Sequence, residues 1–281
     1  MHRNRCITPD LYMVSFPPCK INIGLYVVDK RSDGYHNLVT CFYPVPWTDV
    51  LEVVRSEKLS FSNSGSIIPG DKNDNLCLKA YALLKKDFDL PPVKIHLHKI
   101  IPTGAGLGGG SSDAAHTLRL LNTIFHLRIS DEKLFQYAAV LGSDCAFFIQ
   151  DKPALAQGRG EILSDISLSL SGKHIVIINP AIHVSTAQAF ANITPRSIDI
   201  NLVDVLTNQK VGAWKSQVKN DFEASVFNHY PELDEIKAKL YNAGALYACM
   251  SGSGSSLFGI FEEPTNLQNK FFGYTLWSGQ L

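Results

Sequence analysis

The stretch from Pro102 to Asp113 restricts the fold of this chain more than any other segment. It reads PTGAGLGGGSSD, and five of the seven residues from 104 to 110 are glycine. An alternating strand pattern at 93–98 precedes it, and an apolar helix is predicted over 113–125. Because glycine adopts positive φ and lets a ligand approach the backbone, successive N–H groups can form a concave anion site beside the helix start. The sequence therefore predicts a phosphate-binding loop.

Other interpretations of this glycine-rich segment fit less well. A flexible linker would not lie between an amphipathic strand and an apolar helix. A Walker A loop requires a lysine after its last glycine, and none follows here. Residues 104–109 match G-x-G-x-x-G, but a dinucleotide site would need this match after the first strand, with an acidic residue at the end of the second. The V-A-I-K, H-R-D and D-F-G motifs of protein kinases are absent.

The composition is typical of a soluble globular enzyme. Of 281 residues, 45% are apolar and 19% are charged, and 26 basic side chains balance 26 acidic ones. This balance does not favour nucleic acid or an anionic membrane surface, and no apolar run approaches the roughly 18–20 residues that span a bilayer. The first residues lack the apolar core of a secretory signal. Six scattered cysteines without C-x-x-C spacing predict reduced thiols in a cytoplasmic protein.

Periodicity predicts a mixture of strands and helices. Residues 19–27 read as a half-buried strand with one polar face, and 35–45 as its return strand after the turn at 32–34. Further strands are predicted at 49–55, 58–62, 93–98, 175–179, 247–250 and 255–261. Helices are predicted at 75–88, 113–125, 131–141, 221–226 and 232–242. Because these elements lack a regular βαβ alternation, they favour an α+β fold, with a domain boundary within 151–160.

Three blocks resemble the motifs of the GHMP kinases, the superfamily of galactokinase, homoserine kinase and mevalonate kinase. Pro102–Ala115 resembles the second motif, which is long and specific. Pro18–Leu25 resembles the first motif, and Met250–Ser256 the third. The resemblance implies a two-domain fold with ATP and substrate in a cleft. A ribosomal protein S5 domain 2-like ATP-binding lobe would span 1–155, and a ferredoxin-like substrate-binding lobe would span 156–281.

Further blocks narrow the resemblance. Lys30–Leu38, Leu141–Phe148 and Gly158–Glu161 look like segments of the GHMP kinases that act on 4-diphosphocytidyl-2-C-methyl-D-erythritol. The matching blocks cover nearly the whole chain except its two ends. The resemblance implies phosphorylation of the 2-hydroxyl of this substrate in the non-mevalonate route to isoprenoids, with ATP and Mg²⁺.

The resemblance places the nucleotide on and around the glycine-rich loop. The expected nucleotide-binding residues are Asn75, Lys99, Pro102, Gly104, Gly106, Leu107, Gly108, Gly109, Gly110, Ser111 and Ser112. Ser111 and Ser112 can cap the helix or offer hydroxyls to phosphate or Mg²⁺. Asn75 also reads as a plain helix N-cap. Asp113 is expected to be the first helical residue and to point away from the phosphates.

Lys20 and Asp144 are the expected catalytic residues. In the resembled family the lysine and the aspartate flank the substrate hydroxyl, and the aspartate takes its proton. The lysine would also neutralise charge on the transferring group. Asp144 lies between two apolar segments, so we expect it to be partly buried. From the residues alone, Asp144 reads equally well as a turn or N-cap residue, and Lys20 reads better as a surface lysine on an edge strand.

A further set of residues is expected to bind the substrate. These residues are Asn22, Tyr35, His36, Phe190, Gly252 and Ser253. His36 could hydrogen-bond the cytosine edge, and an aromatic ring could stack on the cytosine face. Phe190 reads equally well as a core residue. His96 and His98 alternate on one strand face without a third ligand, so they read as part of a solvated face and no protein ligand for a metal is expected.

Two other functions remain open at this point. One is a GHMP kinase for another small alcohol of the mevalonate or homoserine type, against which Gly34-Tyr35-His36 argues. The other is a non-catalytic nucleotide-binding homologue, against which the presence of both Lys20 and Asp144 argues. The expected partner is a small-molecule substrate, with no nucleic acid and no membrane, and the protein is expected to be a monomer or a weak homodimer.

Overall fold

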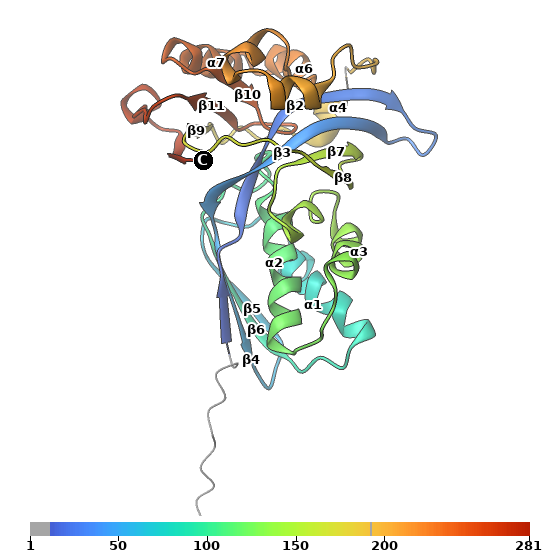
Figure 1. Ribbon diagram of the computed structural model, residues 1–281. Coiled ribbons are helices and arrows are strands. Elements are labelled where there is room, and N and C mark those ends of the chain that lie inside the picture. Colours follow the sequence, from blue (N-terminus) through green and yellow to red (C-terminus); the bar gives the residue numbers. More distant parts are fainter. Residues whose placement is uncertain (1–11, 192) are drawn as a thin grey trace, which may run out of the picture. The chain divides into compact units, whose positions relative to one another are not determined.

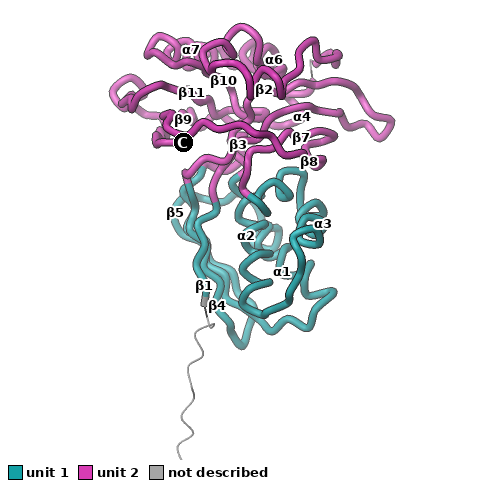
Figure 2. Tube along the Cα trace, in the orientation of Figure 1, with its two compact units in different colours: residues 1–17, 48–101, 109–150 teal, residues 18–47, 102–108, 151–281 magenta. Residues whose placement is uncertain are grey.

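The computed structural model describes residues 12–191 and 193–281 (Figure 1). The described chain folds into two compact units, each assembled from several segments (Figure 2). Unit 1 contains the described residues up to 17 together with 48–101 and 109–150. Unit 2 contains 18–47, 102–108 and 151–281. Most of the glycine-rich loop, residues 102–108, therefore belongs to the same unit as the first and third motifs.

The expected domain boundary at 155/156 lies close to the last passage between the units, at 150/151. The segment 18–47 does not follow that boundary, since it belongs to unit 2. The reason is strand pairing, because the second strand of this segment lies next to strand 154–158 in one sheet. The division into two domains at 155/156 stays a prediction.

Unit 1 is a sheet with helices packed on it. Its strands are β1 (Tyr12–Ser15), β4 (Val50–Arg55), β5 (Ser60–Gly65) and β6 (Val93–Lys99), in the order β1-β4-β6-β5. β4 is antiparallel to β1 and β6, whereas β5 is parallel to β6. Its helices are η1 (Lys72–Asp74), α1 (Leu76–Asp87), α2 (Gly109–Ile124), α3 (Asp131–Leu141) and η2 (Phe147–Ile149). α1, α2 and α3 pack on one another, and α2 contacts β1 and β4 (Figure 1).

Alternation along β6 decides which of its side chains enter the core of unit 1. Val93, Ile95 and Leu97 are buried beneath the helices. The two histidines of β6 face outward and bond to the hydroxyls of Ser62 and Ser64 on β5, so the expected solvated face is confirmed. The alternation continues to Lys99, which is buried on the core side.

Unit 2 contains two sheets. The first has β2 (Pro18–Lys30), β3 (His36–Thr48), β7 (Ala154–Gly158) and β8 (Ile162–Asp165) in chain order. The second has β9 (His174–Asn179), β10 (Tyr247–Met250), β11 (Leu257–Phe261) and β12 (Thr275–Gln280) in the order β10-β11-β9-β12, antiparallel throughout. Its helices are α4 (Thr186–Phe190), α5 (Leu202–Asn208), η3 (Val211–Ser216), α6 (Phe222–His229), α7 (Pro231–Asn242) and η4 (Gln268–Lys270).

The core of unit 2 lies between the second sheet and helices α6 and α7. α7 contacts β10 and β11, and its Leu233, Ile236 and Leu240 are fully buried. They pack in one apolar cluster with Val176 and Ile178 of β9. The helix predicted at 232–242 and the buried strand predicted at 175–179 are therefore confirmed.

β2 departs from the expectation of a half-buried strand. The alternation is present, but both faces are buried, with Lys20 only 3% and Asn22 only 2% exposed. The polar face is covered by the glycine-rich loop, whose Gly106 carbonyl accepts from Lys20, and by the third motif, whose Ser251 hydroxyl accepts the Asn22 main-chain N–H. Covering by loops from distant parts of the sequence leaves no trace in local periodicity, so the expectation was wrong on this point.

None of the helices in the described residues has the length and apolar character that a membrane span requires. Cys19, Cys41, Cys77, Cys145 and Cys249 are free and buried. Cys6 lies outside the described residues.

Candidate active site

Lys20 and Asn22 lie on the same face of β2 and bond to each other. The Lys20 ammonium donates to the Asn22 side-chain oxygen at 2.6 Å and to the main-chain oxygen of Gly106 at 3.1 Å. It also lies 4.9 Å from the centre of the Phe42 ring. The Asn22 amide donates to the Thr40 hydroxyl at 3.0 Å, and that hydroxyl in turn donates to the Gly24 carbonyl. Two neighbouring strands thus fix the orientation of both polar side chains.

Ser251 of the third motif joins this network. Its hydroxyl accepts from the Asn22 main-chain N–H at 3.2 Å and donates to the Gly106 carbonyl at 2.8 Å. The Lys20 main-chain N–H donates to the Leu107 carbonyl at 2.9 Å, and the Ser256 N–H to the Ala105 carbonyl at 3.2 Å. Segments of all three sequence motifs therefore meet within unit 2, although they are far apart in the sequence.

The glycine-rich loop has the backbone that its composition predicts. Gly104, Gly106 and Gly108 have φ of 68°, 79° and 70°, in the left-handed region that favours glycine. Gly106 and Gly252 also approach each other closely, since a Cβ built on Gly252 would lie 3.3 Å from the Gly106 Cα. The predicted turn conformation is confirmed for these residues, whereas their contact with phosphate stays a prediction.

The helix after the loop begins earlier than predicted. α2 begins at Gly109, so Gly109, Gly110, Ser111 and Ser112 are its first residues. The expectation of a start at Asp113 was wrong because glycine at 109 and 110 accepts helical backbone angles as readily as turn angles. Asp113 is therefore the fifth residue of α2 and not the first, and it is buried. Its expected direction away from the phosphates stays a prediction.

A buried ion cluster in unit 1 joins the two chain segments that flank the glycine-rich loop and so forms the base of this loop. Lys99, at the end of β6, binds the carboxylates of Asp49 and of Asp113, the latter at 2.9 Å. The other oxygen of Asp49 accepts the main-chain N–H groups of Ile100 at 2.5 Å and Ile101 at 2.9 Å. This cluster ties the residues that lead into the loop to the first turns of α2.

The cluster buries one lysine with two carboxyl groups, and this arrangement shifts the pKa values of Lys99 and Asp113. Burial raises the pKa of Asp113 to about 7, against the opposing effect of Lys99 and with support from the nearby charge of Asp49. Burial alone would lower the pKa of Lys99, but the two carboxylates raise it above its ordinary value. Lys99 therefore stays charged, and Asp113 holds its proton more tightly than an ordinary carboxyl group does.

The other residues expected at the nucleotide have local roles in unit 1. Asn75 is the N-cap of α1, because its side-chain oxygen accepts the Cys77 N–H at 2.9 Å. This agrees with the plain N-cap interpretation. Lys99 is 2% exposed and ion-paired, so its assignment to the adenine side stays a prediction. Ser112 is fully buried in α2, and its hydroxyl has no hydrogen-bond partner.

Asp144 lies in the turn that follows α3 in unit 1. It is half-buried, as expected from its apolar neighbours. The next helix, η2, has Ala146 as its N-cap residue, without a side-chain cap. The turn interpretation of Asp144 is therefore correct, while the N-cap interpretation is wrong. Its catalytic role stays a prediction.

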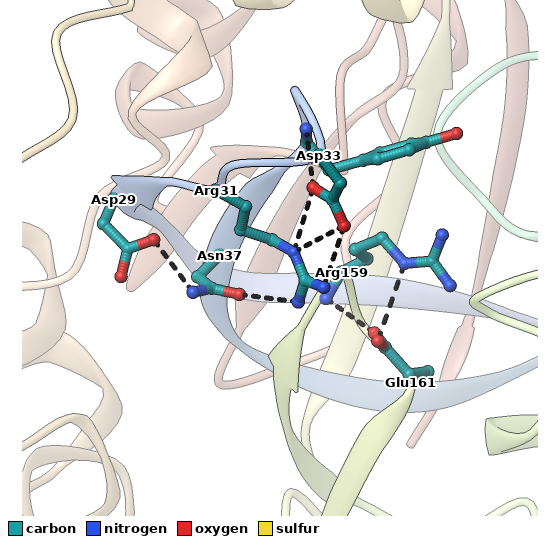
Figure 3. Close-up of polar contacts among 7 residues, drawn as sticks. Asp29, Arg31, Asp33, Asn37, Arg159 and Glu161 are labelled. Carbon is teal, nitrogen blue, oxygen red and sulfur yellow. Dashed lines mark hydrogen bonds and ion pairs between the residues drawn. The ribbon is translucent and has the colours of Figure 1, made fainter.

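Tyr35 lies in the turn at the tip of the paired strands β2 and β3, beside a cluster of charged groups. Figure 3 shows the contacts of these charged groups, which include Arg31, Asp33 and Glu161. Asp33 accepts from the Arg31 guanidinium and from the Tyr35 main-chain N–H at 3.1 Å. The Arg159 guanidinium lies over the Tyr35 ring, 5.0 Å from its centre, and the Arg159 N–H donates to Glu161 at 2.6 Å. Tyr35 is 56% exposed, so its ring is available to a ligand.

His36 and Phe190 lie together next to this tip. Their rings stack at 4.7 Å with an interplanar angle of 15°, and Phe190 also packs edge-on against Phe222. Phe190 is half-buried, at the end of α4. The structure thus brings two of the residues predicted at the pyrimidine side into contact. Gly252 and Ser253 follow β10 in the loop that contacts Gly106.

Several residues of this arrangement were missed from the sequence. Ser251 and Thr40 orient Asn22, and Asp49 holds the base of the glycine-rich loop. Burial of Lys99 could have been read from its place in the apolar register of β6. For Asp49 no local signal exists, since it follows a strand in a position where many proteins have a turn residue.

Comparison with known proteins is consistent with these motifs. The family model of the GHMP kinases N-terminal domain matches residues 75–152, and that of the GHMP kinases C-terminal domain matches 207–271. A Bacteroides fragilis protein named 4-diphosphocytidyl-2-C-methyl-D-erythritol kinase is 52% identical over 264 residues, covering 92% of this chain and 96% of that protein. A Cytophaga hutchinsonii protein of the same name is 50% identical over 266 residues, covering 92% and 98%.

A solved structure gives the same relationship. The crystal structure of a 4-(cytidine 5'-diphospho)-2C-methyl-D-erythritol kinase matches with a TM-score of 0.81 and 31% identity. The match covers 95% of this chain and 98% of that one. Because the sequence and fold similarities both extend over nearly the whole chain, the protein belongs to the GHMP kinase family.

Proposed function

We propose that this protein is a cytoplasmic kinase that transfers the γ-phosphoryl group of ATP to the 2-hydroxyl of 4-diphosphocytidyl-2-C-methyl-D-erythritol. The products are ADP and the 2-phosphate, within the non-mevalonate route to isoprenoids. Relatives at 50–52% identity carry the name of this activity. The observation that carries the proposal is the network of Lys20, Asn22, Gly106 and Ser251, which joins residues of all three kinase motifs.

Lys20 is proposed to stabilise charge on the transferring phosphoryl group. Phosphoryl transfer depends on positioning and on cations around the phosphate oxygens, because little covalent chemistry is required of the protein. The Lys20 ammonium is 3% exposed and is oriented by two neutral oxygen acceptors, of Asn22 and Gly106. A preorganised ammonium of this kind loses little energy to reorientation when charge develops.

Asp144 is proposed as the general base. Its carboxylate accepts the proton of the substrate 2-hydroxyl while the hydroxyl oxygen forms its bond to phosphorus. Its half-buried position in a turn between apolar residues supports this role, since partial exclusion of water strengthens its interaction with a hydroxyl.

The amides of residues 104–110 are proposed to hold the ATP phosphates. Their support is the run of positive φ angles at Gly104, Gly106 and Gly108, which turns successive N–H groups away from the regular ladder of a strand. The base of the loop is held by the ion cluster of Lys99, Asp49 and Asp113. This mode of binding needs no excess of basic residues, in agreement with the formal net charge of zero.

Mg²⁺ is proposed to accompany ATP. Among the described residues, no group of three or more His, Cys, Asp and Glu side chains could hold a metal ion. Mg²⁺ commonly uses few protein ligands together with substrate phosphates. The Ser112 hydroxyl is buried without a hydrogen-bond partner. Its oxygen and that of the neighbouring Ser111 hydroxyl are the proposed ligands of such an ion. When bound, Mg²⁺ would offset negative charge on the phosphates.

The cytidine end is proposed to bind at Tyr35, His36 and Phe190. The stacked pair of His36 and Phe190 and the exposed ring of Tyr35 offer flat surfaces to a pyrimidine. Asn22, Gly252 and Ser253 are proposed to contact the methylerythritol phosphate portion. Their support is that Asn22 and the 251–252 turn converge on Gly106.

A substrate panel tests this function. The purified protein is incubated with γ-labelled ATP and the cytidine-linked substrate, mevalonate or homoserine, and the product is identified by ³¹P NMR. We expect transfer to the cytidine-linked substrate alone, with phosphate on its 2-oxygen. Equal kcat/KM on another alcohol would contradict the assignment, and ATP binding without transfer to any alcohol would indicate a non-catalytic homologue. Lys20→Met should abolish most transfer, while Lys94→Met, at an exposed strand lysine, should keep it.

A further inference from the structure

The segment Lys219–Glu223, which reads KNDFE, lies directly against β2 in unit 2. The Leu25 N–H donates to the Lys219 carbonyl at 2.9 Å, and the Asp221 N–H donates to the Leu25 carbonyl at 2.8 Å. The Asp221 side chain also accepts the Val27 N–H at 2.9 Å. These bonds fix the position of the segment relative to the strand that carries Lys20 and Asn22.

Asn220, at the centre of this segment, binds the loop of the third motif. Its side-chain amide donates to the carbonyls of Met250 and Gly252, both at 2.8 Å. Its side-chain oxygen accepts the Phe222 N–H at 3.0 Å. Asn220 is 2% exposed, so both amide donors are buried and both are used. An unmade bond at this place would leave buried polar groups without partners, which destabilises the folded loop.

The two carbonyls bound by Asn220 flank Ser251. Fixing them fixes the Met250–Ser251 and Gly252–Ser253 peptide planes, and so restrains the left-handed turn at Gly252, where φ is 57°. Ser251 then accepts the Asn22 N–H and donates to the Gly106 carbonyl, which is also an acceptor for Lys20. A continuous set of hydrogen bonds thus runs from Asn220 to the Lys20 ammonium.

We propose that Asn220 is a positioning residue for phosphoryl transfer, which clamps the two carbonyls around Ser251 and so fixes the Gly106 carbonyl and Asn22 for Lys20. The expected effect on kcat rests on the proposed function. The clamp itself rests only on the contacts of Asn220 with Met250 and Gly252. Asn220 lies outside the three kinase motifs, so no motif assigns a role to it.

Asn220→Asp tests the clamp with almost no change in volume. Aspartate keeps an oxygen that accepts the Phe222 N–H, but it replaces the two donors with a carboxylate oxygen facing two carbonyls. We expect kcat to fall about 10–100-fold, since small misplacements of a catalytic group have effects of this size. The KM for ATP should change less than kcat. Amide hydrogen exchange of residues 251–256 should accelerate in the variant.

Asn266→Asp is the matched control. Asn266 is exposed, and its side-chain oxygen accepts the N–H two residues ahead, from Gln268 at 3.0 Å, as Asn220 does from Phe222. This control should keep the wild-type kcat and the wild-type exchange of 251–256. If Asn220→Asp fails to fold, Asn220→Ala removes the same donors without adding charge and should give the same two changes.

Separate outcomes would overturn the two levels of the proposal. A wild-type kcat in a folded Asn220 variant, even with a lower Tm, would show that Asn220 only stabilises the fold. Unchanged exchange of 251–256 would show that it does not hold the loop. If the wild-type protein phosphorylates no substrate, the proposed function fails, whereas the exchange comparison still decides whether the clamp exists.

Discussion

Gly106 lies so close to Ser251 that no side chain fits between them. A Cβ built on Gly106 would lie 2.0 Å from the Ser251 carbonyl oxygen and 3.2 Å from that of Gly254. The Ser251 hydroxyl and the Lys20 ammonium both donate to the Gly106 carbonyl. The glycine is therefore needed at the point where the three motifs meet, for space as well as for its φ of 79°.

Gly106→Ala should lower both stability and activity. The methyl group must displace the Ser251 backbone, at a cost of roughly 1–3 kcal/mol from overpacking. Gly104→Ala is the control, because Gly104 has a similar φ of 68° but a Cβ added to it would meet no atom within 4 Å. Urea unfolding of the two variants measures the difference in stability, and steady-state kinetics of Gly106→Ala measure the loss of activity. Equal losses in both variants would show that backbone strain alone, without the Ser251 contact, governs this position.

Lys99→Met should destabilise unit 1 strongly. It would leave the carboxylates of Asp49 and Asp113 buried without their cation, and breaking such a cluster costs about 3–5 kcal/mol. Lys94→Met, on the exposed face of the same strand, should change the free energy of unfolding by less than about 0.5 kcal/mol. Chemical denaturation of both variants tests this, and similar small effects would argue against a structural role for the cluster.

Asp113 should make stability depend on pH in an unusual direction. Its pKa is raised from 3.8 to about 7, so the folded state binds this proton more tightly than the unfolded state does. Its contribution to stability is therefore greatest at acidic pH and is lost as pH rises towards 7, by at most about 1.4 kcal/mol per unit. Relative to Asp113→Asn, the wild type should lose stability between about pH 4 and pH 7 and change little above that range. A difference that stays flat, or that grows in favour of wild type, would contradict this.

Arg159→Ala should weaken binding of the cytidine-linked substrate. The guanidinium lies over the Tyr35 ring and holds it, and an exposed cation–π contact contributes about 0.5–1 kcal/mol, which is a two- to fivefold rise in KM. The KM for ATP should stay unchanged. Lys215→Ala removes a comparable contact, with Tyr241 at 4.2 Å, and serves as the control. A rise in both KM values would indicate general damage to unit 2.

Much of the fold was predictable from local patterns. The α+β GHMP kinase fold is confirmed, and so are most strands and helices, because period-2 and helical periodicity mark them directly. The start of α2 was misplaced because Gly109 and Gly110 are compatible with either a turn or a helix. The second buried face of β2 was missed because its cover comes from residues 105–107 and 251–256, far away in the sequence.

The site was predictable where a motif carries its own geometry. The glycines at 104, 106 and 108 indicated left-handed backbone, and the structure has it. Supporting residues such as Asp49, Thr40 and Asn220 carry no such pattern, since each acts through a few hydrogen bonds to partners that are distant in the sequence. Only the folded chain reveals which main-chain groups these side chains reach.

The single-turnover rate of phosphoryl transfer by Asp144→Asn is the most direct test of the proposed general base. Single-turnover transfer from ATP to 4-diphosphocytidyl-2-C-methyl-D-erythritol is measured for wild type, for this variant and for Asp89→Asn, a control at an exposed carboxylate. We expect the wild type and the control to transfer phosphate, and Asp144→Asn to do so about 10²–10⁴-fold more slowly, the usual contribution of a positioned base. A variant as fast as wild type would remove Asp144 from its role, and a wild-type protein that transfers no phosphate to this substrate would contradict the proposed function itself.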